Sequence, residues 1–223
     1  MIPVPLFVRS PSSFFEGSER TNAIGSLQAY ESKTGFHFDR FAYEGQGHPN
    51  EITYSDLAGV GMLSVSVPAY ATLWLMGEGA KRVSDLLAQI KPEWRVWDDE
   101  PHLAQGSSAW NLWDVIRTRD GLGPCGMGPT LVSKLLAMKR PHLIPVRDSR
   151  VCWTLFGRDH DENFDDWAAW RNELRSPQGE QLRSLVAEVQ NEAGYPDTTS
   201  VLRIIDIVVW SASDTVHGVS SSE

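Results

Sequence analysis

Residues 121–151 read GLGPCGMGPTLVSKLLAMKRPHLIPVRDSRV, and the clearest turn and helix signals of the chain lie in this stretch. It opens with Gly–apolar–Gly turns and continues into an apolar run. Gly126 and Gly128 permit positive φ and let the backbone approach a phosphate closely. Pro129 suits the first position of a helix, where its missing N–H would have had no intrahelical partner. The spacing that follows predicts a helix whose inward face carries Leu131, Val132, Leu135 and Leu136.

The sequence on both sides of this stretch indicates a mainly α-helical protein. Ser107 and Ser108 favour a helix start upstream of the turn, which gives a helix-hairpin-helix element at about 108–140. Residues 198–210 are apolar nearly all round, as in a helix buried in the core. No convincing pair of strands and no internal repeat is present.

We expect three segments along the chain. Residues 1–50 are rich in Gly, Ser, Pro and aromatic residues without a sustained period, so we predict an irregular N-terminal region with a short extended piece at 36–43. Residues 51–215 form the helical domain in this interpretation, with a subdomain boundary within 91–106. Residues 216–223 are predicted to be a disordered tail.

Charge is unevenly distributed along the chain. The net charge of the protein is −9, which argues against general electrostatic coating of DNA. Residues 117–150, however, contain seven Lys and Arg against two acidic residues, so this segment carries +5 and the remainder −14. Either an ordinary solvated surface or an anion-binding face explains the segment. The candidate phosphate or nucleic-acid contacts are Gly126, Gly128, Thr130, Lys134, Lys139, Arg140 and Arg147.

The run from Lys139 to Val151 adds a family resemblance. Together with the glycine turn, it resembles the helix-hairpin-helix, Gly/Pro and aspartate signature of the endonuclease III and alkylpurine DNA glycosylase superfamily. Asp148 lies twenty residues beyond Gly128, as the endonuclease III pattern requires. The resemblance covers about thirty residues and implies binding of DNA. The wider sequence is also similar to a group of actinobacterial proteins of unassigned function, in which a Lys-Leu-Leu-Ala-x-Lys-Arg-Pro-x-Leu-Ile-Pro-Val run recurs.

Asp148 is the candidate catalytic residue that the resemblance implies. It would stabilise an oxocarbenium-like sugar or activate water. The alternative is an N-cap, because Asp148 precedes the start of a further helix. Thr130 stands where bifunctional members carry the Schiff-base lysine, so we do not expect lyase chemistry by that route. Lys134, one helical turn later, is not expected to replace it.

Tryptophans and one internal charge pair suggest a second kind of site. The chain has nine tryptophans, and Trp110, Trp113 and Trp153 flank the hairpin region. Such side chains stack on a flipped base, line an apolar small-molecule pocket, or simply fill the core. Arg203 and Asp206 lie three residues apart on the most apolar predicted helix. An internal ion pair explains them, and a pocket carboxylate at Asp206 is the sharper alternative.

Several other classes of protein are not indicated. The six histidines and two cysteines have no metal-ligand spacing, and residues 159–162 are a hydrophilic loop, so we expect no metal site and no cofactor. No signal peptide and no membrane-spanning stretch is recognisable, which favours a cytoplasmic protein. The sequence leaves the oligomeric state open.

Three functional hypotheses follow. The first is a nucleic-acid-binding relative of the monofunctional base-excision glycosylases, active or inactive, with DNA as partner. The second is a small-molecule enzyme of specialised metabolism on the same helical scaffold, with Asp148 and a tryptophan-lined pocket. The third is a structural or regulatory module with a vestigial hairpin.

Overall fold

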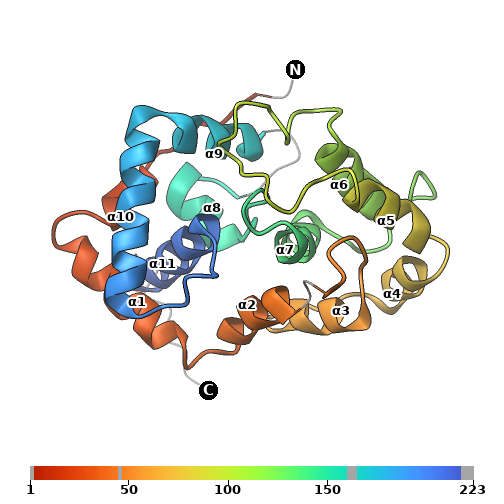
Figure 1. Cartoon of the computed structure of the whole chain (residues 1–223), viewed down its shortest axis with the longest axis horizontal. Coiled ribbons are helices and arrows are strands. Elements are labelled where there is room, and N and C mark those ends of the chain that lie inside the picture. The colour runs from red at the N-terminus through yellow and green to blue at the C-terminus, as the bar shows by residue number, and fades with distance from the viewer. Residues whose placement is uncertain (1–2, 45–46, 160–164, 217–223) are drawn as a thin grey trace.

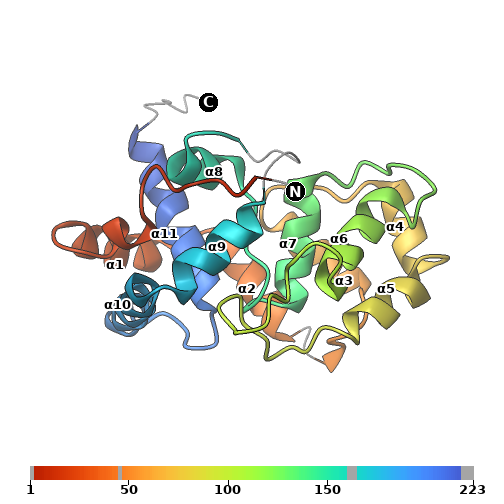
Figure 2. The ribbon, with the colours of Figure 1, turned by 90° about the horizontal axis from the view of Figure 1, so that it is seen from above.

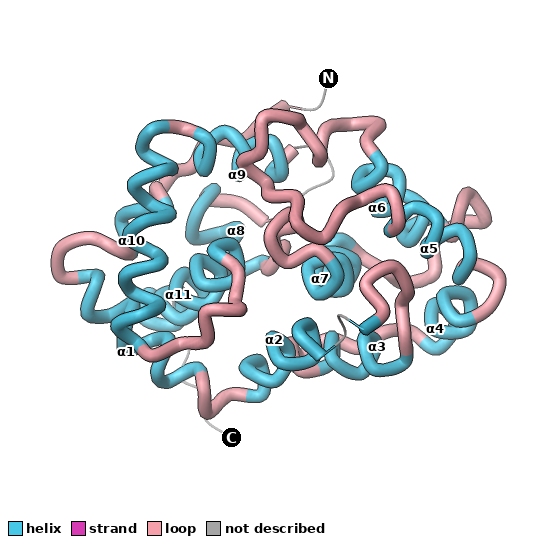
Figure 3. Tube along the Cα trace, viewed as in Figure 1, coloured by secondary structure: helices cyan, strands magenta, loops and turns pink. Residues whose placement is uncertain are grey.

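A computed structural model describes residues 3–44, 47–159 and 165–216, and within them the protein is all-helical, as predicted. Figure 3 shows helices joined by loops, with no strand in the described ranges. No described helix has both the length and the apolar content to cross a membrane. The elements are η1 (Pro11–Phe14), α1 (Glu19–Tyr30), α2 (Thr34–Glu44), α3 (Tyr54–Gly61), α4 (Ala69–Met76), α5 (Ala80–Leu87), α6 (Ser108–Thr118), α7 (Pro129–Lys139), α8 (Ser149–Phe156), α9 (Asp166–Arg175), α10 (Pro177–Ala193) and α11 (Val201–Val216).

The helices form two lobes (Figures 1 and 2). The terminal lobe contains α1 and α8–α11, and in it α1 packs against α10 and α11 while α8 packs against α11. The middle lobe contains α2–α7, and in it α3 packs against α2 and α7 while α5 packs against α6. Both ends of the chain therefore build one lobe and its middle builds the other. The division predicted at residue 50 falls between α2 and α3, which lie in the same lobe.

The prediction of an irregular N-terminal region is wrong from Glu19 to Glu44, where the chain forms α1 and α2. Ala23, Leu27 and Tyr30 are buried and recur at helical spacing, which anchors α1 on the core. The piece predicted as extended at 36–43 lies within α2. Glycine, serine and aromatic residues have weak helix propensity, and their abundance hid the helical spacing in the sequence. Burial against the rest of the protein outweighs such weak local preferences.

The region around the predicted hairpin contains two consecutive helices, α6 and α7, in contact with one another. The hydroxyl of Ser107 accepts a hydrogen bond from the Trp110 N–H at 3.2 Å, so this cap is confirmed. Pro129 is the first residue of α7, after Gly128 as N-cap. Whether the pair is a helix-hairpin-helix of the glycosylase type stays a prediction.

The buried helix predicted at 198–210 is present as α11. Its residues from Leu202 to Val209 are all buried. The helix continues to Val216, so it extends past the predicted end of the core helix. The tail predicted at 216–223 lies, from residue 217 on, outside the described residues.

Candidate functional site

The two lobes enclose a cleft of about 440 Å³, which we call the interlobe cleft. Its volume is in the range of small-molecule sites, roughly 300–1,000 Å³. One wall comes from α1 and α11 and the other from the α3–α4 loop and the start of α7, while α8 begins at the cleft. The residues of the cleft used below are Tyr30, Lys33, Leu63, Thr130, Lys134, Asp148, Arg150, Arg203, Asp206, Ile207 and Trp210.

Asp148 lies in this cleft at the start of α8. Its Oδ1 accepts a hydrogen bond from the Arg150 N–H at 3.0 Å, so the N-cap interpretation is confirmed. Its Oδ2 lies 3.4 Å from Nζ of Lys134, which also donates to the Leu63 carbonyl at 3.1 Å. About a fifth of the Asp148 side chain is exposed (21%), against 6% for Lys134. The cap therefore leaves the carboxylate in contact with the cleft.

Asp206 reaches the same cleft from α11. Its Oδ2 pairs with Nη1 of Arg203, while its Oδ1 has no hydrogen-bond partner among the described residues. Burial raises the pKa of Asp206 to about 6, the Arg203 charge opposes this, and the negative charge of Asp148 adds to it. The ion pair predicted within this helix is confirmed. Asp206 also lies in the wall of the interlobe cleft, and its use as a pocket carboxylate stays a prediction.

Arg203 connects the cleft to the other lobe. Its Nε donates to Oδ1 of Asp39 on α2 at 2.8 Å, and its Nη2 donates to the Tyr30 hydroxyl at 2.7 Å. Its guanidinium also lies over the Phe38 ring at 5.3 Å. Arg203 is thus held by groups from both lobes, which fixes the position of Asp206 beside it.

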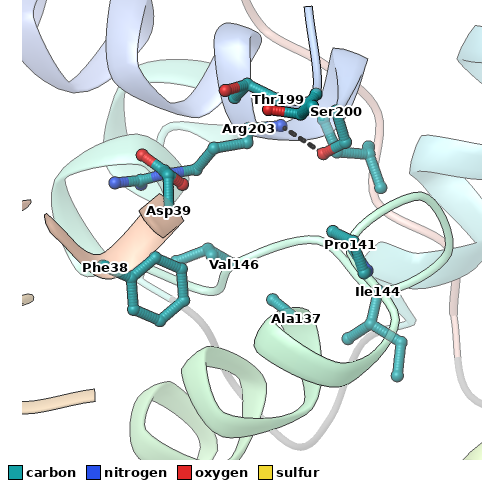
Figure 4. A pocket seen from close by; sticks show the side chains of 11 residues that line it. Phe38, Asp39, Ala137, Pro141, Ile144, Val146, Thr199, Ser200 and Arg203 are labelled. Atoms are coloured by element: carbon teal, nitrogen blue, oxygen red, sulfur yellow. Dashed lines mark hydrogen bonds and ion pairs between the residues drawn. The ribbon is translucent and has the colours of Figure 1, made fainter. Parts of the chain in front are cut away.

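A second pocket lies on the far side of Arg203. Figure 4 shows Phe38, Ala137 and Ile144 around its apolar part, with Asp39 and Arg203 at one end. Its cavity volume is about 40 Å³, room for one or two water molecules. A substrate needs more space, so the interlobe cleft is the better candidate site.

The predicted basic face is not formed by Lys139 and Arg140, which are interior residues. Lys139 is 5% exposed, and its Nζ pairs with Asp56 at 2.6 Å. Arg140 is fully buried and donates only to carbonyl and amide oxygens. Their charges are satisfied inside the middle lobe, so the expectation that they contact phosphate on the surface is corrected.

Arg147 and two of the predicted tryptophans lie together, but not in the cleft. Nε of Arg147 lies 2.8 Å from Oδ2 of Asp166, and burial raises the pKa of that carboxyl to about 6. Trp110 and Trp113 surround this pair together with Trp167, around a cavity of about 50 Å³. Their position favours the core interpretation of these tryptophans.

The remaining predicted residues lie apart from these cavities or at the cleft edge. Trp153 is 52% exposed and lines none of the four cavities described here. Gly126 adopts φ +81° as expected, whereas Gly128 has φ −71°, which any residue adopts. Thr130 lines the cleft beside Lys134. The two glycines shape the turn, and only Thr130 and Lys134 of this set reach the site.

Several cleft residues were missed by sequence reasoning, among them Tyr30, Lys33 and Trp210. Tyr30 and Lys33 belong to the region predicted as irregular. Trp210 carried a usable signal, because Arg203, Asp206 and Trp210 recur at i, i+3 and i+7 and so share one face of α11.

A metal centre is not indicated among the described residues, which contain no group of three or more His, Cys, Asp or Glu suited to an ion. Of the hydrophilic loop 159–162, residues 160–162 lie outside the described part.

Comparison with curated proteins finds no match, and comparison with solved structures finds none. Residues 23–213 match a protein family, from within α1 almost to the end of α11. This range includes every residue that lines the interlobe cleft. The chain belongs to the family described as a family of unknown function, DUF6308.

Proposed function

We propose that this protein is an enzyme that acts on a small molecule in the interlobe cleft by general acid–base catalysis. The observation that carries the proposal is the presence of two carboxylates, Asp148 and Asp206, in one cleft but in unlike surroundings. Pairs of titratable groups whose environments differ in this way commonly divide the roles of acid and base.

We base the proposed roles on the surroundings of the two carboxylates. Burial raises the pKa of Asp206 to about 6, so this carboxyl retains a proton in mildly acidic solution. Asp148 faces the ammonium of Lys134 and a backbone N–H group at the start of α8, both of which stabilise negative charge. Asp206 is therefore the proton donor and Asp148 the proton acceptor.

A hydrolysis fits these two roles. Asp206 donates its proton to the leaving atom as the bond to that atom breaks. Asp148 accepts a proton from the attacking water, whose oxygen forms the new bond. The ion pairs with Lys134 and Arg203 hold the carboxylates of Asp148 and Asp206 in position.

A base-excision enzyme acting on DNA is the second candidate. It is favoured by one observation: Thr130, in the first turn of α7, and Asp148 line the same cleft, as the glycosylase resemblance implies. Against it, Lys139, Arg140 and Arg147 are at most 6% exposed, which removes three of the cations expected to contact phosphate.

The test compares the wild type with Asp148→Asn and Asp206→Asn on nitrophenyl esters, phosphates and glycosides. We expect release of nitrophenol from one class, reduced at least about 100-fold by Asp148→Asn, in the range typical of general acid–base catalysis. Turnover unaffected by both substitutions would refute the proposal. A duplex carrying damaged bases, assayed at low salt, tests the second candidate, which predicts excision that Asp148→Asn abolishes.

A further inference from the structure

The interlobe cleft borders a second cavity. This cavity of about 490 Å³ lies between α1 and α11, and we call it the α1–α11 groove. Tyr30, Lys33 and Trp210 line both the groove and the cleft. The two spaces therefore adjoin at these three side chains and offer a ligand about twice the room of the cleft alone.

Between Glu19 and Tyr30, which lie at the two ends of α1, the α1 side of the groove is formed by small and uncharged polar residues. Gly25 and Ala29 leave space, and a Cβ atom added at Gly25 would meet no atom within 4 Å. Thr21, Asn22 and Ser26 supply hydroxyl and amide groups. This wall suits a ligand rich in hydroxyl groups, since both partners donate and accept hydrogen bonds.

Trp210 marks the passage from cleft to groove. Its indole is half-buried and meets the Tyr30 ring edge-to-face, with centroids 6.3 Å apart. Arg150, which lines the cleft but not the groove, lies 5.3 Å from the indole. An indole presents an apolar surface on which the C–H face of a sugar ring packs.

We infer that the substrate of the proposed enzyme is an oligosaccharide, with its scissile bond beside Asp148 and Asp206 and its following units crossing Trp210 into the α1–α11 groove. This inference rests on the proposed function. Asp206 gives its proton to the glycosidic oxygen as the C–O bond breaks. Water adds to the anomeric carbon, and its proton passes to Asp148, so that one water is consumed for each bond.

Two other chain-like ligands fit the groove less well. A peptide that binds as an added β-strand needs an exposed strand edge, but the groove walls are helices whose interior backbone groups are already paired. A nucleic-acid strand needs a track of cations, yet the groove offers Lys33 as its cation and Glu19 as an acidic neighbour.

The experiment measures binding of chito-, cello- and malto-oligosaccharides of two to six units by calorimetry. The variants are Gly25→Tyr, which fills the groove, and Gly61→Tyr as matched control. Both glycines are exposed helical residues with no atom within 4 Å of an added Cβ, and Gly61 lines neither cavity. Circular dichroism verifies that both variants are folded.

In one series, we expect affinity for the wild type and for Gly61→Tyr to rise at least tenfold from two to five units. Gly25→Tyr should lose this gain and still bind the shortest member. Affinity independent of length, equal effects of the two variants, or binding of peptides in place of sugars would overturn the inference.

Turnover separates this inference from the proposed function. Suppose that hydrolysis of a small nitrophenyl substrate needs Asp148 but that oligosaccharide length has no effect on binding. This result would support the enzyme proposal and contradict an oligosaccharide as its substrate. Length-dependent binding of oligosaccharides without hydrolysis at any pH from 4 to 8 would support the groove as a sugar-binding site. The same result would contradict the proposed acid–base catalysis.

Discussion

Nζ of Lys134 lies 3.4 Å from Oδ2 of Asp148, and the pair joins the middle lobe to the terminal lobe across the interlobe cleft. One turn and a residue further along α7, Nζ of Lys139 lies 2.6 Å from Oδ2 of Asp56 inside the middle lobe. The two pairs differ in burial: the Asp148 side chain is 21% exposed and the Asp56 side chain 1%. Solvent therefore reaches the first pair and not the second.

This difference predicts unequal costs for removing the two lysines. Lys139→Met leaves the Asp56 carboxylate buried without its cation, which costs about 3–5 kcal/mol of unfolding free energy. Lys134→Met should cost less than half as much unfolding free energy, because Asp148 keeps its exposure to solvent and its hydrogen bond from the Arg150 N–H. Urea denaturation of both variants measures the difference. Equal losses would contradict the interpretation of Lys134 as a residue of the site.

The local structure around α7 could be predicted because its signals lie close together in sequence. Pro129, the apolar spacing after it and the cap at Asp148 all act within one or two helical turns. The site was partly predictable for the same reason: Asp148 follows a short loop, and Asp206 is a charged residue on an apolar helix. Both lie in the cleft.

The sequence could not show whether the lysine and arginine side chains of residues 117–150 are exposed or buried. A basic segment looks alike whether its charges face solvent or pair inside a core, and the deciding partners lie far along the chain. Lys139 meets Asp56, and Arg140 meets the carbonyls of Leu87 and Ile90. The groove was missed for a related reason, because α1 presents small polar residues, which carry little helical pattern.

Arg140 is the second case for mutation. All its donor groups are used: Nε and Nη2 bind the carbonyls of Ile90 and Leu87 at the end of α5, and further bonds reach Pro49, Asn50 and Lys139. Burial lowers the pKa of its guanidinium to about 10. The side chain acts as a buried cap that fastens the end of α5 to α7.

We expect Arg140→Lys to destabilise the protein by about 3 kcal/mol or more, since an ammonium has three donors and leaves buried oxygens unpaired. Arg175→Lys is the control, because Arg175 pairs at the surface with Asp99, whose side chain is 97% exposed. That change should stay within about 0.5 kcal/mol. Chemical denaturation compares the two, and a small effect at Arg140 would argue against its role as a cap.

The turn before α7 offers a matched pair of glycines. Gly126 has φ +81°, and a Cβ there would lie 3.0 Å from Cγ of Pro68, whereas Gly128 has φ −71° and open space. Gly126→Ala should therefore lower the unfolding free energy by about 1–2 kcal/mol, and Gly128→Ala should leave it nearly unchanged. Thermal unfolding of both variants checks this. A larger loss of stability for Gly128→Ala than for Gly126→Ala would contradict the turn geometry described here.

The pH dependence of stability tests the environment of Asp206. Burial raises its pKa in the folded protein to about 6, above the ordinary aspartate value of 3.8. The folded state therefore binds the proton more tightly than the unfolded state, so the contribution of Asp206 to stability is largest below pH 3.8 and is lost as pH rises through 6. The same protonation should make activity fall above pH 6, if Asp206 is the proton donor.

Relative to Asp206→Asn, the wild type should gain about 1 kcal/mol of unfolding free energy between pH 7.5 and pH 5. Asp166 titrates in the same range but is present in both proteins, so its contribution cancels. Asp99→Asn retains Asp206, so this control should show the same gain as the wild type relative to Asp206→Asn. Denaturation curves at the two pH values give the difference. A difference of the opposite sign would mean that the Arg203 cation outweighs burial, which would leave Asp206 ionised and remove it as the proton donor.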